Sequence, residues 1–173
     1  QQLTRYFGGA DAAKDSLITD ESVYIASISE NLEYKRAIAR KAAALLDDGD
    51  IVFINSSSTA MLIYPYIEKN VIIITNNGRA LTLKRPTGVG LMLTGGEVQG
   101  CKQSLTGQAA LDMLSRITAT KCILGVSGIS VKGGITSLVM QETAINRKML
   151  ERCSGEKIIV ADHTKIGLEY NFF

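Results

Sequence analysis

A chain of 173 residues, of which 46% are hydrophobic and 21% charged, is long enough for one well-packed α/β domain, and a second full domain is not expected. Its apolar runs are far shorter than the ~20 residues that cross a bilayer. No basic region followed by an apolar stretch opens the chain, so we expect a soluble cytoplasmic protein without a membrane partner. The formal charge of +2 and the lack of a Lys/Arg block argue against nucleic-acid binding by these residues.

Cysteine and histidine usage argues against a metal site. Cys101, Cys122 and Cys153 are widely separated and lack C-x-x-C spacing, so neither a disulfide framework nor a zinc site is predicted. His163 is the single histidine, and one histidine without a second His or Cys nearby cannot form a metal site. We therefore expect no metal and no cofactor.

The first half of the chain opens with residues that resemble a linker. Residues 1–20 are polar and irregular, and residues 23–27 could form a short extended segment. A helix is predicted from Asn31 to Leu46, and Asp47-Asp-Gly-Asp50 ends it. Its apolar residues at helical spacing are Ile38, Ala42, Leu45 and Leu46.

From residue 51 onward, strands alternate with helices. We predict strands at 51–54, 71–75, 89–93, 121–126 and 157–161. We predict helices at 59–67, 78–83, 107–116 and 142–152. This alternation indicates an α/β fold with a mostly parallel sheet and helices on both faces, because right-handed crossovers need about that much chain. Ligands of such sheets bind at the carboxyl ends of the strands.

The strand at 51–54 leads into a loop rich in hydroxyl groups. Its four residues are all apolar, as expected for a strand buried on both faces. Between this strand and the next helix lie Asn55 and then four residues with hydroxyl groups, Ser56, Ser57, Ser58 and Thr59. Free backbone N–H groups at a helix start, together with hydroxyl donors, can hold a phosphate. The alternative is an ordinary helix N-cap with spare hydroxyls.

Other strand ends carry similar polar or glycine-rich loops. The candidate ligand contacts there are Thr75, Asn76, Asn77, Gly95, Gly96, Glu97 and Gly128. The asparagines could instead form only a turn or cap, and the glycine pair could reflect only a close backbone approach. Three charged residues complete the candidate site, namely Glu142, Asp162 and Lys165. Glu142 could simply begin a helix, and Lys165 could be a solvated surface lysine.

A series of short motifs carries a resemblance to a known family. The motifs are Arg5-x-x-Gly8-Gly9-Ala10, Lys35-Arg-Ala-Ile-Ala39 with Ala42-Ala43, Asp48-Gly49-Asp50, Asn55 to Thr59, Thr75-Asn76-Asn77, Thr94-Gly95-Gly96-Glu97, Leu124-Gly125 with Ser127-Gly128-Ile129, Gly134-Ile135-Thr136 and Ala161-Asp162-x-x-Lys165. In order and spacing they resemble the C-terminal sensor domain of DeoR-family transcriptional repressors over nearly the whole chain.

The resemblance implies a domain that binds a phosphorylated sugar or related metabolite and that forms a homo-dimer or tetramer. It implies a ribose-5-phosphate isomerase-like fold, and the stretch from Lys132 to Glu142 looks like that enzyme's too. DNA would be contacted only through a missing N-terminal winged helix-turn-helix. We accordingly predict a linker at 1–20 and an effector-binding and oligomerisation domain at 21–173.

The chain departs from the family pattern in the loop after the strand at 51–54. The family loop usually reads D-S-G-T-T, whereas this chain has Asn55 for the aspartate and Ser57 for the glycine. The first change removes a carboxylate that would order sugar hydroxyls or repel phosphate. The second removes tolerance for positive φ.

Two classes of function compete, and the residues after the strand at 121–126 discriminate between them. A sugar-phosphate isomerase needs a carboxylate as general base, and the similar isomerases carry a D-G-A-D loop there. Here residues 125–129 contain no ionisable group, so Glu142 alone would have to serve. We predict a sensor of sugar phosphates in a transcriptional repressor of carbohydrate metabolism, not an enzyme. An isomerase-like enzyme and an oligomerisation module without a ligand remain the alternatives.

Overall fold

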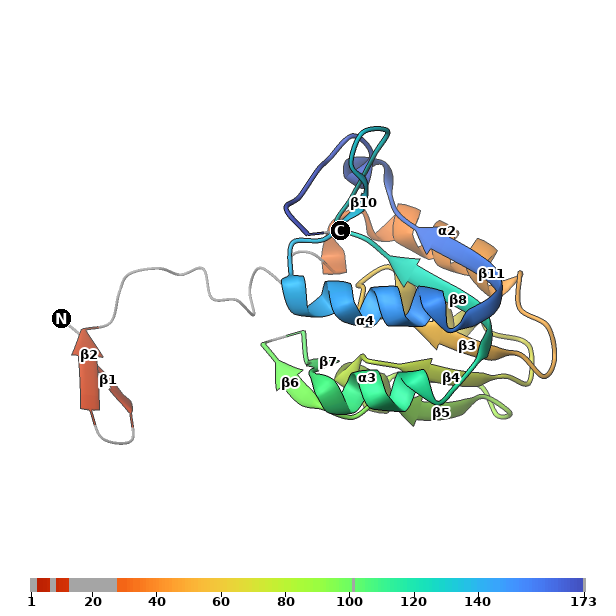
Figure 1. The fold of residues 1–173 in the computed structure, drawn as a ribbon, viewed down its shortest axis with the longest axis horizontal. Coiled ribbons are helices and arrows are strands. Elements are labelled where there is room, and N and C mark those ends of the chain that lie inside the picture. The colour runs from red at the N-terminus through yellow and green to blue at the C-terminus, as the bar shows by residue number, and fades with distance from the viewer. Residues whose placement is uncertain (1–2, 7–8, 13–27, 101, 173) are drawn as a thin grey trace.

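The computed structural model describes residues 3–6, 9–12, 28–100 and 102–172, and a five-stranded sheet forms its centre (Figure 1). The strands are β3 (Ile51–Ile54), β4 (Ile72–Thr75), β5 (Gly90–Leu93), β8 (Ala119–Gly125) and β11 (Cys153–Val160). They lie in the order β11-β8-β3-β4-β5, and each neighbouring pair is parallel. The predicted α/β fold with a parallel sheet is therefore confirmed.

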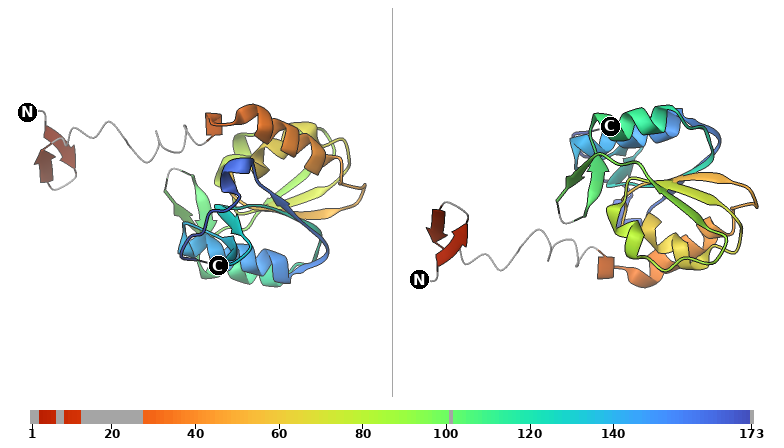
Figure 2. Two further views of the ribbon diagram at one scale, coloured as in Figure 1. Left: turned by 90° about the horizontal axis from the view of Figure 1, so that it is seen from above. Right: turned by 90° about the horizontal axis from the view of Figure 1, so that it is seen from below.

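Helices cover both faces of the sheet, as Figure 2 shows. On one face, α2 (Leu32–Ala43) and the 3₁₀ helix η1 (Ala60–Tyr66) share a buried core with Val52 and Ile73. On the other, α3 (Gln108–Ser115) and α4 (Met140–Glu151) share a core with Phe53 and Ile74. Successive strand residues point to opposite faces, so a strand covered on both sides needs apolar residues throughout.

The helix predicted at 31–46 is shorter than expected. It ends at Ala43, and its buried side chains are Lys35, Ala39, Ala42 and Ala43. Leu45, one of the apolar residues at helical spacing, follows the last helical turn and is 49% exposed. The helix predicted at 59–67 is a 3₁₀ helix that contains Pro65, and proline cannot donate the hydrogen bond that an α-helix requires there.

Short elements connect these layers, and one of them, the helix predicted at 78–83, was expected from the sequence. Two antiparallel hairpins follow strand ends, β6 (Glu97–Gln99) with β7 (Ser104–Thr106), and β9 (Gly128–Ser130) with β10 (Gly134–Thr136). The 3₁₀ helices η2 (Gly78–Thr82) and η3 (His163–Lys165) follow β4 and β11. Near the N-terminus, β1 (Leu3–Tyr6) pairs with β2 (Gly9–Ala12), so the expectation of an irregular segment is wrong for those residues. The extended segment expected at 23–27 lies outside the described residues.

The amino end of the sheet is closed by a buried ion pair. Lys121 on β8 places its Nζ 2.9 Å from Asp50 Oδ2 and 2.6 Å from Asp47 Oδ2. Burial raises the pKa of Asp50, but hydrogen bonds from the Asp47 N–H, Lys121 and Thr120 outweigh burial and hold that pKa below its ordinary value. Within the described ranges, none of the helices has the length and apolar content that crossing a membrane requires.

Candidate effector site

The sheet reverses its direction of winding between β3 and β8. From β3 the chain proceeds to β4 and β5 on one side, whereas β8 and β11 lie on the other. The loops that follow β3 and β8 therefore leave in different directions, and a crevice forms at the carboxyl ends of these two strands. A cavity of about 640 Å³ opens there, and Asn55, Ser57 and Ser58 line it together with residues 125–127.

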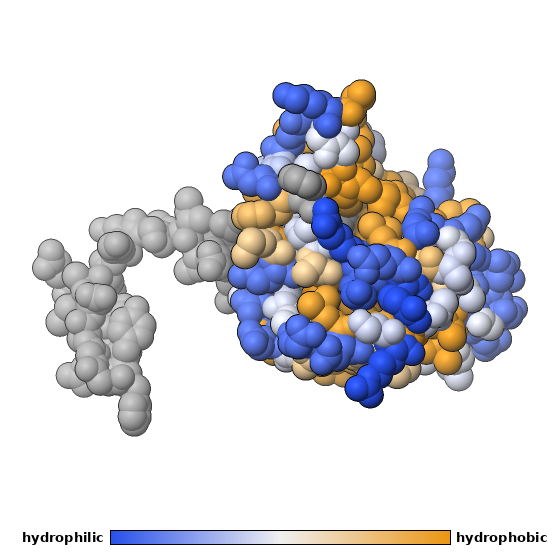
Figure 3. All heavy atoms as spheres, in the orientation of Figure 1, coloured by the Kyte–Doolittle hydropathy of each residue, from blue (hydrophilic) through white to orange (hydrophobic). Residues whose placement is uncertain are grey.

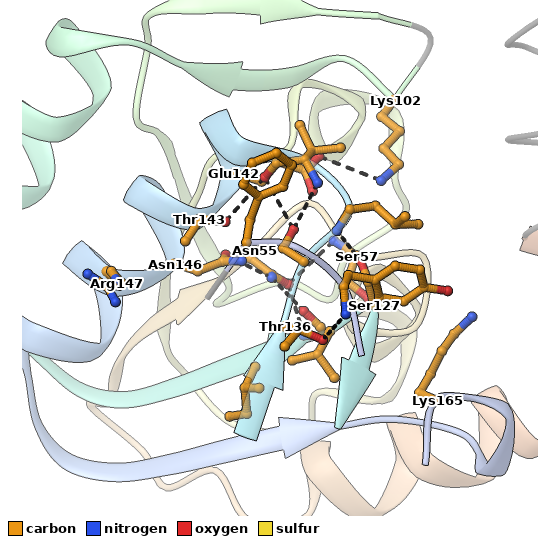
Figure 4. A pocket seen from close by; sticks show the side chains of 18 of the residues that line it. Asn55, Ser57, Lys102, Ser127, Thr136, Glu142, Thr143, Asn146, Arg147 and Lys165 are labelled. Carbon is orange, nitrogen blue, oxygen red and sulfur yellow. Dashed lines mark hydrogen bonds and ion pairs between the residues drawn. The ribbon is translucent and has the colours of Figure 1, made fainter. Parts of the chain in front are cut away.

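Three further segments contribute to the walls of the cavity, which Figure 4 shows from close by. The end of β6 and the loop that follows it contribute Gln99, Gly100 and Lys102, and Ile135, Leu138 and Val139 add apolar side chains. The C-terminal segment adds Tyr170 and Phe172. This segment is fastened by the Ser137 N–H, which donates to the Phe172 carbonyl at 2.6 Å. On the surface, hydrophobic side chains gather between α4 and β10 (Figure 3).

The serine loop after β3 satisfies part of its own backbone. Ser57 Oγ accepts hydrogen bonds from the backbone N–H groups of Thr59 and Ala60, at 3.2 and 3.5 Å. Gly125 makes room for this arrangement, since a Cβ at that position would lie 1.7 Å from Ser57 Oγ. Positive φ among the described non-glycine residues occurs at Asn31 and Gln103, so Ser57 takes an ordinary conformation without the glycine of the family loop. Ser58 lines the cavity, and no hydrogen bond to another described residue engages its hydroxyl or N–H.

Asn55 joins the ends of the two central strands. Its Oδ1 accepts from the Gly125 N–H at 3.0 Å, and its Nδ2 donates to the Gly125 carbonyl at 2.8 Å. The same Nδ2 donates to Asn146 Oδ1 on α4 at 3.0 Å. A neutral amide fits one donor and one acceptor of Gly125 at once, whereas a carboxylate could serve only as an acceptor. Asn55 thus contributes no charge to the cavity floor.

Polar residues on one face of α4 form the wall opposite the serine loop. Glu142 and Asn146 are four residues apart, and Thr143 and Arg147 repeat that spacing, so all four lie on the same side of the helix. Glu142 Oε1 lies 3.6 Å from Nζ of Lys102, which reaches across from the β6–β7 loop. Ile145 and Met149, on the adjacent side of the helix, are buried in the core.

The segment after β11 places one cation in the cavity. Lys165 in η3 lines the cavity, and Asp162 caps this short helix through the N–H and hydroxyl of Thr164. Burial raises the pKa of Asp162, but the bonds from Thr164 and the charges of Lys165 and Lys35 outweigh burial and hold that pKa below its ordinary value. Asp162 is therefore an anion that sits behind Lys165, and it does not line the cavity itself.

Several predicted contacts instead form a buried network beside the cavity. Ser56 Oγ lies 2.9 Å from Ser104 Oγ, and Asn76 Nδ2 donates to Ser104 Oγ and to the Leu105 carbonyl. Asn77 caps η2, accepting from the backbone N–H of Arg79. Ser56 and Asn76 thus fasten β7 to the ends of β3 and β4, while Asn77 has the capping role that the alternative interpretation of the asparagines allowed.

The other predicted residues that do not line the cavity have structural surroundings. A Cβ at Gly96 would lie 2.2 Å from the Thr106 carbonyl, and one at Gly128 would lie 2.5 Å from the Leu168 carbonyl, so both glycines permit close backbone approach. Residues Thr59, Thr75, Gly95 and Glu97 also lie outside the cavity lining. Of the predicted set, the structure brings Ser57, Ser58, Glu142 and Lys165 together, and their role in binding stays a prediction.

Sequence reasoning missed several residues of the lining. Lys102, Ser127, Thr136, Thr143, Asn146 and Arg147 line the cavity but were not singled out. The polar spacing along α4 was a usable signal, because residues 142, 143, 146 and 147 mark one helical face. The part of the chain that the structure describes contains no group of three or more His, Cys, Asp or Glu side chains that could hold a metal ion.

Comparison with known proteins settles the family. The model of the DeoR C terminal sensor domain matches residues 30–172. The chain belongs to this family. The glycerol-3-phosphate regulon repressor of Escherichia coli (strain K12) is 30% identical over 168 residues, which is 95% of this chain and 65% of that protein. The HTH-type transcriptional regulator GolR of Listeria innocua is 28% identical over 144 residues, 82% of this chain and 56% of that protein. This sensor domain therefore spans only part of the length of these relatives.

The fold is also similar to that of an enzyme. Ribose 5-phosphate isomerase A of Methanocaldococcus jannaschii superposes with a TM-score of 0.54 and 16% identity, over 79% of this chain and 55% of that one. The ribose-5-phosphate isomerase-like fold expected from the sequence is thus confirmed. Identity this low shows the fold alone, because one fold supports many functions.

Proposed function

We propose that this chain is the effector-binding domain of a DNA-binding transcriptional repressor of carbohydrate metabolism. The effector is a phosphorylated sugar or a related metabolite, and the cavity at the ends of β3 and β8 holds it. Family membership and the regulatory roles for which the relatives are named support this proposal. DNA is read by a winged helix-turn-helix N-terminal to this domain, with residues 1–20 as linker and residues 21–173 binding the effector and forming a dimer or tetramer.

The charge of the cavity lining carries the proposal. Its described residues include three cationic side chains, Lys102, Arg147 and Lys165, and one carboxylate, Glu142. A phosphate dianion balances this excess of positive charge. Ser58 offers a hydroxyl and a backbone N–H as neutral donors, so we place the phosphate between Ser58 and Lys165. The apolar side chains of Ile135, Leu138 and Val139 and the remaining polar groups of α4 then surround the sugar.

Binding acts through a shift between two arrangements of the oligomer. The effector tightens the loops around the cavity, and these loops set how the subunits hold their DNA-binding domains apart. Only a ligand that binds one arrangement more tightly than the other has this effect.

The test is calorimetry on this chain with a panel of sugar phosphates and their parent sugars. We expect a phosphorylated sugar to bind far more tightly than its parent, because the parent cannot meet the cations. Ser58→Asp should nearly abolish binding of the phosphate through like-charge repulsion. Ser58→Ala is the matched control and should cost about 1–2 kcal/mol, the scale of a hydrogen bond to a charged group. Equal affinity for both sugar forms would overturn the proposal.

An isomerase-like activity is the second candidate, because Glu142 lies in the cavity of an isomerase-like fold. We propose binding without turnover, since residues 125–129 supply no ionisable group and Glu142 is then the one carboxylate among the described lining residues. NMR in deuterated water gives the test. Enzyme-dependent entry of deuterium at C2 of a sugar phosphate would establish catalysis instead.

A further inference from the structure

The loop between β6 and β7 is held firmly at its base. Ser104 is buried and bonded to Ser56 and Asn76, and the Gly78 N–H donates to the Gln103 carbonyl at 2.8 Å. The loop residues Gln99, Gly100 and Lys102 instead line the cavity. One side of the loop is therefore anchored to the sheet while the other side covers ligand space.

An ion pair links this loop to α4 across the cavity. Nζ of Lys102 and Oε1 of Glu142 are 3.6 Å apart, and their side chains are 41% and 14% exposed. The 3.6 Å separation is long for an ion pair and the lysine end is open to water, so the pair stabilises little and a stronger anion can replace Glu142 as the partner of Lys102. Figure 4 shows Lys102 and Lys165 on the same side of the cavity, with Arg147 on the other.

We propose that the Lys102–Glu142 ion pair is a latch that the effector phosphate opens. This inference rests on the proposed function of the cavity as a phosphate site. The phosphate dianion carries more charge than a carboxylate and takes Lys102 from Glu142, using the flexible lysine side chain. Lys102 then pairs with the phosphate, and Glu142 becomes free to accept hydrogen bonds from sugar hydroxyls.

The latch makes Lys102 and Glu142 determinants of specificity. An unphosphorylated sugar brings no anion to Lys102, so Glu142 stays paired and its hydroxyl-binding capacity stays blocked. A phosphorylated ligand supplies the competing charge and exposes Glu142 in the same step. The cavity therefore binds the sugar hydroxyls fully only when the ligand also carries a phosphate.

The test is a double-mutant cycle with inorganic phosphate as the probe, measured by calorimetry on this chain. Glu142→Gln should tighten phosphate binding about fivefold, the factor that corresponds to a solvent-accessible ion pair, because Lys102 no longer has a competing partner. Lys102→Gln should weaken binding by at least as much. In the Lys102→Gln background, Glu142→Gln should have no further effect. Lys148→Gln is the matched control, because Lys148 forms an ion pair with Glu151 on the same helix outside the cavity.

Two results would overturn the latch. One is unchanged or weaker phosphate binding by Glu142→Gln, and the other is an equal gain with and without Lys102. Lys102 is exposed, so its single variant should fold normally, and undiminished phosphate binding by that variant also refutes the latch. If the unmodified chain binds neither phosphate nor any sugar phosphate, the proposed function fails together with the latch. If the unmodified chain binds these ligands but the double-mutant cycle gives either of the two results above, only the latch is refuted.

Discussion

Replacing Asn55 by aspartate should separate the structural role of this amide from its role in the cavity. Asn55 is 5% exposed, and its Nδ2 donates to two acceptors, the Gly125 carbonyl and Asn146 Oδ1. Aspartate loses both donations and sets a negative oxygen against the two acceptors. The Asn146 side chain can turn its amide to offer a donor, but the Gly125 carbonyl belongs to β8 and cannot.

The expected cost is that of one buried acceptor left unpaired, about 1–3 kcal/mol. With a urea m-value of roughly 2 kcal/mol per M, the unfolding midpoint should fall by about 1 M at pH 7. The sign of the pH dependence follows from burial, which raises the pKa of the new carboxyl in the folded state. Above that pKa the full penalty applies, and as the pH falls the protonated acid regains an O–H donor, so the deficit should shrink toward pH 4.

The matched control is Asn146→Asp. It keeps an acceptor for Asn55 Nδ2 and adds the same charge to the same cavity, so it should weaken phosphate binding while leaving the urea midpoint nearly unchanged. The reasoning is refuted if Asn55→Asp unfolds at the same urea concentration as the unmodified chain at pH 7, or if its deficit grows as the pH is lowered.

Three further predictions concern other parts of the fold. Gly96→Ala should destabilise the fold by several kcal/mol, because the new Cβ meets a backbone carbonyl. Gly95→Ala has open space around its Cβ and should cost only about 1 kcal/mol of backbone strain. Urea unfolding of the two variants measures this difference. The pKa of Asp50 in the folded chain lies below its ordinary value of 3.8, so Asp50 stabilises the fold above that ordinary pKa and loses this contribution as the pH falls through the folded-state pKa. The unfolding midpoint of Asp50→Asn should therefore depend less on pH between about pH 4 and 2 than that of the unmodified chain. Lys165→Ala should weaken a sugar phosphate more than its parent sugar in calorimetry, and equal losses would contradict a phosphate contact.

The parallel sheet could be predicted because burial on both faces leaves a strong sequence signal. Strands such as Ile51–Ile54 have no polar alternation, and the intervening chain lengths suit right-handed crossovers. The hairpins β6–β7 and β9–β10 gave no such signal, because each of their strands has only three residues, too few to show a pattern of burial. Lys102 lies in one of these hairpin loops, so its approach to Glu142 depends on tertiary packing alone.

The candidate site was predicted in outline because strand ends in a parallel sheet meet at one edge. Ser57 and Ser58 follow from that rule. Asn76 and Asn77 follow the same rule and still do not line the cavity, because β4 lies one strand away from the reversal point. The Asn76 side chain binds β7, and the Asn77 side chain caps η2. Distance from the reversal point, which depends on strand order, decides which polar loop is available to a ligand.

Lysine side chains at the two ends of the sheet have different hydrogen-bonding partners. At the amino end, Lys121 is enclosed by Asp47, Asp50 and the Leu45 carbonyl, so its donors are used within the protein. At the carboxyl end, Lys165 and Ser58 face a cavity and keep donors for a ligand. Because a buried ion pair contributes to folding while an open cation contributes to binding, changes at the amino end should alter stability with little effect on phosphate affinity. The same sheet therefore combines a rigid base at its amino end with loops at its carboxyl end that are open to a ligand.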